Sequence, residues 1–148
     1  MSKAFTKEDV ERPVEVPRPV GPVWMTAAGR ELLLQRVEQL RKSGATLAAA
    51  TLMARLEVAR VAAGRPPGDT SPARLGDRVR VRGAQGERCL FLVGPDEVDL
   101  SFDGAEAVSI LSPLGTALVG TEAGELVEVE QPGRQTYELE VLAVGSER

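Results

Sequence analysis

The stretch that most constrains the fold is residues 112–120, which reads SPLGTALVG. Ser112 is a good N-cap because its hydroxyl accepts a free backbone N–H, and proline suits the first helical position. Gly120 can take the left-handed conformation that ends a helix. A helix of about seven residues, roughly 10 Å long, is not stable alone. It must therefore pack on strands, which we place at 108–110, 126–130 and 137–144.

The residues before this helix alternate with a period of two, which is typical of strands. Val79 and Val81 face one way and Arg78, Arg80 and Arg82 face the other, a turn follows at 83–86, and residues 88–93 form the partner strand. The arginine ladder has two interpretations. It is either a solvated sheet face or a contact surface for phosphate or an acidic partner.

The last two strands form a hairpin at 131–134. A three-residue loop places Val129 opposite Tyr137 and Val127 opposite Leu139, which buries the apolar residues together. Glu128 and Glu138 then pair on the outer face. That face is either a solvated acidic surface or a docking surface for a basic partner.

The first half of the chain predicts two antiparallel helices. Thr26 can cap a helix that starts near Ala27, Ser43 and Gly44 break the pattern, and a second alanine-rich and leucine-rich run extends from Thr46 to Ala62. A very short turn makes such helices neighbours. About sixteen residues per helix gives a hairpin of roughly 24 Å.

The fold class is therefore α+β, with a helical hairpin followed by a curved antiparallel sheet that carries one short helix. We divide the chain into a flexible, proline-rich arm at 1–24, the hairpin at 25–65, a linker at 66–74 and the second domain at 75–148.

Composition excludes several classes of function. The 148 residues include no histidine and one cysteine, so neither a disulfide nor a soft-metal site is expected. No membrane span or signal peptide is evident, and a cytoplasmic protein is the default. Residues 1–74 carry a net charge of +4 and residues 75–148 a net charge of −8, which together give the chain's −4. The acidic half would repel nucleic acid, so direct binding to it is at most weak.

No catalytic or cofactor motif stands out. The run from Asp99 to Gly104 imitates the first half of a calcium loop, but Ile110 occupies the position that needs a glutamate. Cys89 has no evident base or metal partner and is interpreted as a buried small apolar residue. We expect no cofactor and no metal.

The second half resembles the C-terminal domain of the bacterial GreA/GreB transcript-cleavage factors. The resemblance rests on VSILSPLG, ALVG, GELVEV, the PGR turn and a final strand, in that order. Residues 1–9 also resemble the leader of many GreB-type members, and residues 25–40 resemble the start of the family's N-terminal coiled coil. The resemblance implies an FKBP-like domain that docks on core RNA polymerase at the rim of its secondary channel. The docking residues that it carries over are Ser112, Pro113 and Leu114, and Leu111 departs from the polar residue that many members have.

The hairpin tip also departs from the family pattern. Family members carry an acidic pair in a Gly-Asp-x-x-Glu context, which helps to hold a catalytic magnesium ion in the polymerase. Here Ala45 and Ala48 follow Gly44 at those positions, and the nearest charges are Arg41 and Lys42. Magnesium needs hard oxygen ligands. We therefore predict a regulator of elongation, not an enzyme, that lacks transcript-cleavage activity and could compete with cleavage factors.

Two alternatives remain open. The chain could be an active cleavage factor that uses acidic residues of the arm, such as Glu8, Asp9 or Glu11. It could instead be an interaction module for another partner, or a prolyl isomerase. The isomerase version is weak because such sites are lined by aromatics, and this domain has only Phe91, Phe102 and Tyr137. The oligomeric state is left open.

Overall fold

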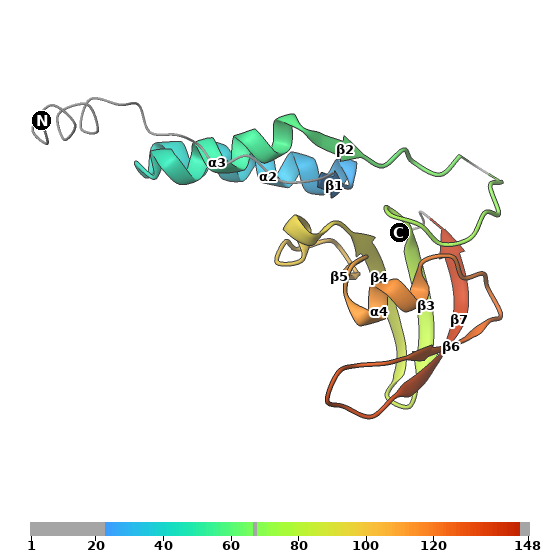
Figure 1. The fold of residues 1–148 in the computed structure, drawn as a ribbon. Coiled ribbons are helices and arrows are strands. Elements are labelled where there is room, and N and C mark those ends of the chain that lie inside the picture. Colours follow the sequence, from blue (N-terminus) through green and yellow to red (C-terminus); the bar gives the residue numbers. More distant parts are fainter. Residues whose placement is uncertain (1–22, 67, 146–148) are drawn as a thin grey trace, which may run out of the picture.

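The computed structural model describes residues 23–66 and 68–145. It confirms the α+β class: a helical pair lies across one end of a curled sheet, and the linker joins them along one side (Figure 1). The predicted arm lies outside the described residues, except that its last two, Val23 and Trp24, belong to a strand. The domain boundaries otherwise stay a prediction.

The hairpin contains β1 (Val23–Met25), α2 (Ala27–Lys42), α3 (Thr46–Glu57) and β2 (Ala59–Val61). Thr26 caps α2 as predicted, because its hydroxyl accepts the Gly29 N–H at 2.9 Å. The second helix is shorter than predicted. It ends at Glu57 and not at Ala62, because residues 59–61 leave the helix to pair in parallel with β1.

The hairpin has a small core of its own. Leu33 and Val37 of α2 lie against Ala49 and Leu56 of α3, and all four are buried. The strands β1 and β2 close the base of the hairpin, where Val23 and Met25 add to the same core. Because α2 has 16 residues and α3 has 12, the longer helix spans about 24 Å and the shorter about 18 Å.

The second domain is a five-stranded sheet with the order β5-β4-β3-β7-β6. Its strands are β3 (Arg78–Gly83), β4 (Gly86–Val93), β5 (Glu106–Ser109), β6 (Leu126–Val129) and β7 (Tyr137–Gly145). The sheet is mixed, which corrects the antiparallel arrangement expected from the sequence, because β5 pairs in parallel with β4. Between them the chain passes through the short 3-10 turn η1 (Pro95–Glu97) and a loop, which return it to the end at which β4 began.

The predicted registers are confirmed. Val129 faces Tyr137 and Val127 faces Leu139 across β6 and β7, and Glu128 faces Glu138. In β3, Val79 and Val81 are fully buried, and the side chains of Arg80 and Arg82 lie on the exposed face. Cys89 is half-buried and free.

The short helix is α4 (Pro113–Leu118), and it covers the apolar face of the sheet (Figure 1). Its Leu118 is fully buried in the core that β3, β4 and β7 form with β6. Gly120 follows with φ +90°, as predicted for the helix end. Among the described helices, none has the length and apolar character needed to cross a membrane.

Candidate docking turn and hairpin tip

Residues 111–114, here called the docking turn, follow β5 and include the N-cap and the first two residues of α4. The Ser112 hydroxyl donates to the Ser109 carbonyl at 2.7 Å and accepts the Gly115 N–H at 3.0 Å. The Leu111 N–H in turn donates to the Ser109 hydroxyl at 3.0 Å. The Ser112 hydroxyl is thus bonded to backbone groups before and after it, and these bonds fix the backbone conformation from Ser109 to Gly115.

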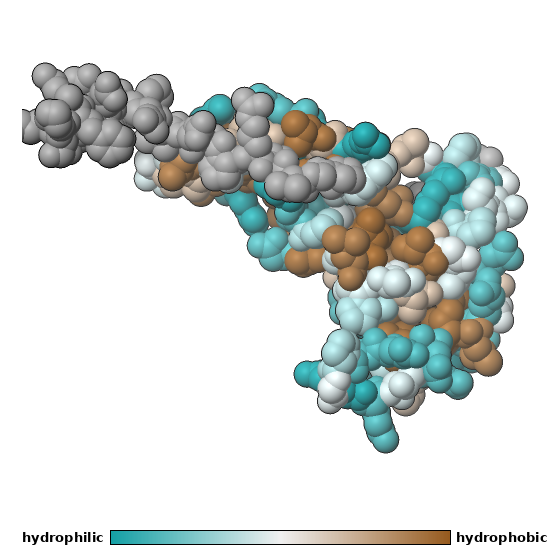
Figure 2. Space-filling view, viewed as in Figure 1, coloured by the Kyte–Doolittle hydropathy of each residue, from teal (hydrophilic) through white to brown (hydrophobic). Residues whose placement is uncertain are grey.

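The side chains of the docking turn differ in how much they expose. Leu111 is 72% exposed, the highest value among the large exposed apolar residues. Pro113 is exposed, whereas Leu114 is half-buried and packs against the core of the sheet domain. Apolar surface gathers on this side of the sheet domain, over the region of β5 and α4 (Figure 2). The turn therefore leaves Leu111 and Pro113 exposed, while Leu114 packs on the core of the sheet domain.

The hairpin tip lies between α2 and α3, at the end that points away from the sheet domain (Figure 1). Gly44 has φ +87°, a conformation that favours glycine and lets the chain reverse within residues 43–45. The Ala45 N–H donates to the Leu40 carbonyl at 2.9 Å, which ties the second helix to the end of the first. Docking turn and tip are thus two separate sites on different domains.

The tip carries cations and methyl groups. Arg41 and Lys42 are exposed in the last turn of α2, where positive charge opposes the negative end of the helix dipole. Arg41 approaches Glu38 at 3.4 Å on the helix surface. Ala48 is exposed and Ala45 is half-buried. Residues 41–48 contain no carboxylate, so they offer no hard oxygen ligand from a side-chain acid.

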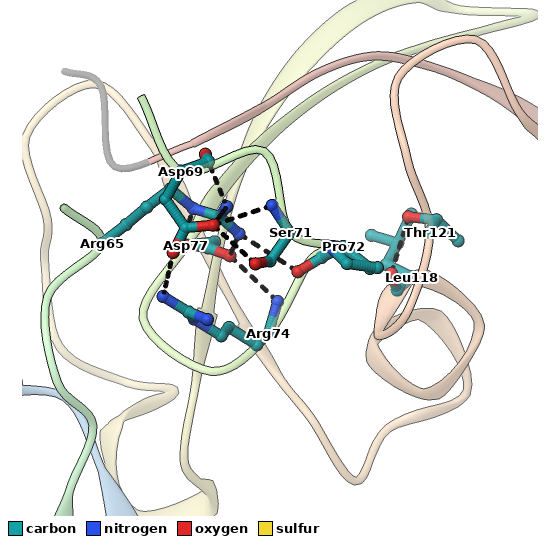
Figure 3. A network of polar contacts seen from close by, with 8 residues as sticks. All are labelled: Arg65, Asp69, Ser71, Pro72, Arg74, Asp77, Leu118 and Thr121. Atoms are coloured by element: carbon teal, nitrogen blue, oxygen red, sulfur yellow. Dashed lines mark hydrogen bonds and ion pairs between the residues drawn. The ribbon is translucent and has the colours of Figure 1, made fainter. Parts of the chain in front are cut away.

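The linker is fastened by a polar network around Arg65 (Figure 3). The Arg65 guanidinium pairs with Asp77 through two hydrogen bonds, one of them 3.0 Å from Nε to Oδ1, and both side chains are at most 5% exposed. Arg65 also donates to the Asp69 and Pro72 carbonyls at 3.0 and 3.1 Å. These bonds fix the conformation of the linker next to the start of β3.

The linker is also bonded to the residues that follow α4. The Ala73 N–H donates to the Thr121 carbonyl at 2.8 Å, and the Gly120 N–H donates back to the Ala73 carbonyl at 2.7 Å. Hydrogen bonds from Ser71, with help from Arg74, lower the pKa of Asp69 to about 2. The hydrogen bond to Asp77 raises the pKa of the Arg65 guanidinium above its ordinary value. The linker is thus bonded both to Asp77, just before β3, and to the residues that follow α4.

Comparison with known proteins identifies the family. The family model described as "Transcription elongation factor, GreA/GreB, C-term" matches residues 69–146, more than half of the chain. The chain belongs to the GreA/GreB family. The transcription elongation factor GreA of Thermodesulfovibrio yellowstonii is 41% identical over 61 residues, which cover 41% of this chain and 36% of that protein.

A second curated GreA protein and a solved GreA/GreB structure are also similar to this chain. GreA of Desulfovibrio desulfuricans is 51% identical over 49 residues, which cover 32% of this chain and 28% of that protein. The chain therefore spans only about a third of the length of the curated GreA proteins it matches. A GreA/GreB structure from Nitrosomonas europaea is 28% identical and has a TM-score of 0.40, with 83% of this chain and 98% of that chain covered.

The other sequence-predicted features of this GreA/GreB chain lie apart from the docking turn and the tip. Arg78 lies over the Phe91 ring at 5.2 Å and Arg82 approaches Glu140 at 4.0 Å, so two rungs of the ladder have partners within the sheet domain. Phe91 and Phe102 pack edge to face with their centroids 4.8 Å apart. Among the described residues, no group of three or more acidic, histidine or cysteine side chains could hold a metal ion, the loop from Asp99 included.

Sequence reasoning missed two features of this family member: the Arg65 network and the buried Glu97. The local spacing of Asp69, Ser71 and Arg74 carried a turn signal, but the carboxylate that lies nearest to Arg65 belongs to Asp77, twelve residues away. Glu97 follows Gly94 and Pro95, a pattern typical of a tight turn. Nothing local predicts that its side chain is fully buried.

Proposed function

We propose that this chain binds core RNA polymerase at the rim of the secondary channel and regulates transcription elongation without stimulating transcript cleavage. Its membership of the GreA/GreB family supports the partner. A docking turn whose backbone is held by Ser112, and which exposes Leu111 and Pro113, supports the mode of binding. The acidic sheet domain favours contact with protein over direct contact with nucleic acid.

The observation that carries the proposal is the chemistry of the tip. A cleavage factor of the expected type must add oxygen ligands to a magnesium ion and its water. At the tip of this hairpin the side chains of Ala45 and Ala48 are methyl groups, and Arg41 and Lys42 bring positive charge near them. Positive charge repels the cation that cleavage needs. A factor of this kind occupies the entrance and does not act on the RNA.

The first experiment tests binding and its location. The full chain should retain core polymerase in a pull-down at micromolar concentration, and Leu111→Glu should weaken that retention. The matched control is Leu126→Glu, because Leu126 of β6 is 70% exposed, about as much as Leu111, but lies outside the docking turn. Retention that is lost equally in both variants, or absent in the wild type, would contradict this part.

The second experiment tests the missing chemistry. Added to backtracked elongation complexes, the chain should release no short 3′ RNA, and it should slow the release caused by an authentic cleavage factor. Release of 3′ RNA by the chain alone would overturn the non-cleaving assignment. A triple replacement of Glu8, Asp9 and Glu11 by alanine would then test the part of the arm that lies outside the described residues.

A further inference from the structure

A buried glutamate joins the two parts of the molecule. Glu97 lies in η1 of the sheet domain and is fully buried. Its Oε1 and Oε2 accept the Thr26 N–H at 3.1 and 3.0 Å, its Oε1 also accepts the Thr26 hydroxyl, and its Oε2 accepts the Gly94 N–H at 2.8 Å. Thr26 is the N-cap of α2. One side chain of the sheet domain is thus bonded to the first turn of the hairpin.

Glycines on both sides make room for this contact. A Cβ placed on Gly29 of α2 would lie 1.7 Å from Glu97 Oε1, and one placed on Gly94 would lie 1.7 Å from the Trp24 carbonyl oxygen. The clash at Gly29 is with the Glu97 side chain, so a Cβ there would displace the carboxylate from Thr26. The clash at Gly94 is with backbone, which cannot rotate away, so the η1 turn approaches the base of the hairpin more closely than any residue other than glycine at position 94 allows.

Two ion pairs flank the glutamate at the same junction. Arg55 of α3 pairs with Asp96 at 2.7 Å, and both side chains are partly buried. Arg36 of α2 approaches Asp99 at 3.5 Å on the surface. Residues 96–99 of the sheet domain thus contact the N-cap of α2, the body of α2 and the end of α3. Three separate points of contact are enough to fix the orientation of one body on another.

Stability alone does not account for a carboxylate at this position. A buried carboxylate costs free energy unless hydrogen bonds replace its water, and an apolar side chain avoids that cost. Hydrogen bonds, however, depend on direction, and a fully satisfied buried network specifies one geometry. Three of the four hydrogen bonds of Glu97 come from backbone N–H groups, and the fourth comes from the Thr26 hydroxyl, which is itself held by the Gly29 N–H. Two of the three donor groups, the N–H and the hydroxyl of Thr26, belong to the hairpin.

We propose that Glu97 is a positioning residue that holds the helical hairpin at one angle to the sheet domain, so that tip and docking turn are presented as a single rigid surface. The consequence for polymerase rests on the proposed function. The rigidity itself is a property of the free chain and is tested without polymerase.

The test measures the distance between the domains in the full-length chain. Cysteines for spin labels replace Lys42 at the tip and Glu87 at the start of β4, both exposed, in a Cys89→Ser background. The parent should give one narrow distance distribution. Glu97→Ala removes the carboxylate and Thr26→Val removes the hydroxyl. Each of these variants should broaden the distance distribution. Thr26→Ser, which keeps the hydroxyl, and Glu57→Ala, which removes an exposed glutamate of α3, should leave it narrow.

Hydrogen exchange separates positioning from unfolding. The amides of β3 and β7 should keep their protection in every variant, because the core of the sheet does not include Glu97. If Glu97→Ala does not fold, the comparison of Thr26→Val with Thr26→Ser tests the proposal. A narrow distribution in Thr26→Val would overturn the proposal, and so would equal broadening in Thr26→Val and Thr26→Ser. A wild-type chain that is rigid but does not bind polymerase would overturn the proposed function only.

Discussion

Gly115 lies where the first turn of α4 crosses the end of β5. A Cβ at this position would lie 1.9 Å from the Ser109 carbonyl oxygen and 2.9 Å from the Ile110 Cα. Both are backbone atoms that cannot rotate away. We expect Gly115→Ala to lower the free energy of unfolding by about 1–3 kcal/mol or more, and to weaken polymerase retention by displacing the docking turn.

Gly64 supplies the control for that change. A Cβ there meets nothing within 4 Å, and its φ is not in the left-handed range. Gly64→Ala should leave stability unchanged or raise it by about 0.4–1 kcal/mol, because alanine restricts the unfolded chain. Urea unfolding measures both variants. Equal midpoints for Gly115→Ala and the wild type would contradict the close approach of α4 to β5.

Glu97 predicts a dependence of stability on pH. Burial raises the pKa of its carboxyl above 4.5, and the hydrogen bonds from Thr26 and Gly94 oppose that rise only in part. No cation contributes, and Asp96 adds to the rise. The folded chain therefore holds this proton more tightly than the unfolded chain. Its contribution to stability is complete below pH 4.5 and is lost as the pH rises through the folded value.

The comparison is the free energy of unfolding of the wild type minus that of Glu97→Gln. This difference should fall as the pH rises above about 4.5 and then level off. Asp69 supplies a control of opposite sign, because its pKa is lowered to about 2. The wild type minus Asp69→Asn should be constant above pH 3.8 and should shrink as the pH falls toward 2. A difference for Glu97→Gln that grows with pH would refute the raised pKa.

Single residues that act through local bonds could be predicted from the sequence. Thr26 and Ser112 are caps because their hydroxyls bond to a backbone three residues away. Glu97 could not be predicted, since its main partner Thr26 lies 71 residues away. A glutamate next to an aspartate in an acidic loop reads as a solvated charge, and only the folded arrangement gives it donors.

The elements divide in the same way. The α4 helix and the β6–β7 register follow from capping, burial and turn length, all of which are short-range. The strand β2 continues an alanine-rich helical run without a break, and it becomes a strand only because β1 lies beside it. The parallel pairing of β5 depends on the path through η1, which no periodicity reports. Long-range pairing overrode local propensity at both points.

The linker predicts a strong coupling between two residues. Arg65→Met would leave the charge of Asp77 buried, since that side chain is 2% exposed. We expect a loss of about 3–5 kcal/mol in the free energy of unfolding. Adding Asp77→Asn removes the stranded charge but keeps an acceptor for the Arg74 N–H, so the double variant should recover part of the loss.

An exposed pair supplies the control for this prediction. Arg88 donates to Glu106 at 2.9 Å, but the two side chains are 36% and 57% exposed. Arg88→Met should cost at most about 1 kcal/mol. Thermal or urea unfolding is measured for the wild type, Arg65→Met, Asp77→Asn, their double variant and the control Arg88→Met. Additive losses for Arg65→Met and Asp77→Asn would mean that the two side chains are not coupled.

At the scale of the whole molecule, the two parts carry opposite charge. The half that contains the hairpin has a net charge of +4 and the half that contains the sheet a net charge of −8. Their junction uses this difference in two ion pairs, but its centre is Glu97, whose donors are uncharged. The ion pairs, which attract the two halves, and the hydrogen bonds of Glu97, which set the angle between them, thus contribute separately to the junction.

Salt separates those two contributions. At about 1 M ionic strength the Debye length is about 3 Å, so exposed ion pairs are largely screened. Arg36–Asp99 is exposed and should be lost, whereas hydrogen bonds from buried neutral donors should persist. We therefore expect the distance distribution between labels at positions 42 and 87 to stay narrow from low to high salt. In Arg55→Met, which keeps Glu97 and removes the stronger ion pair, it should also stay narrow. A distribution that broadens with salt in the wild type would mean that charge, and not Glu97, sets the angle of the hairpin.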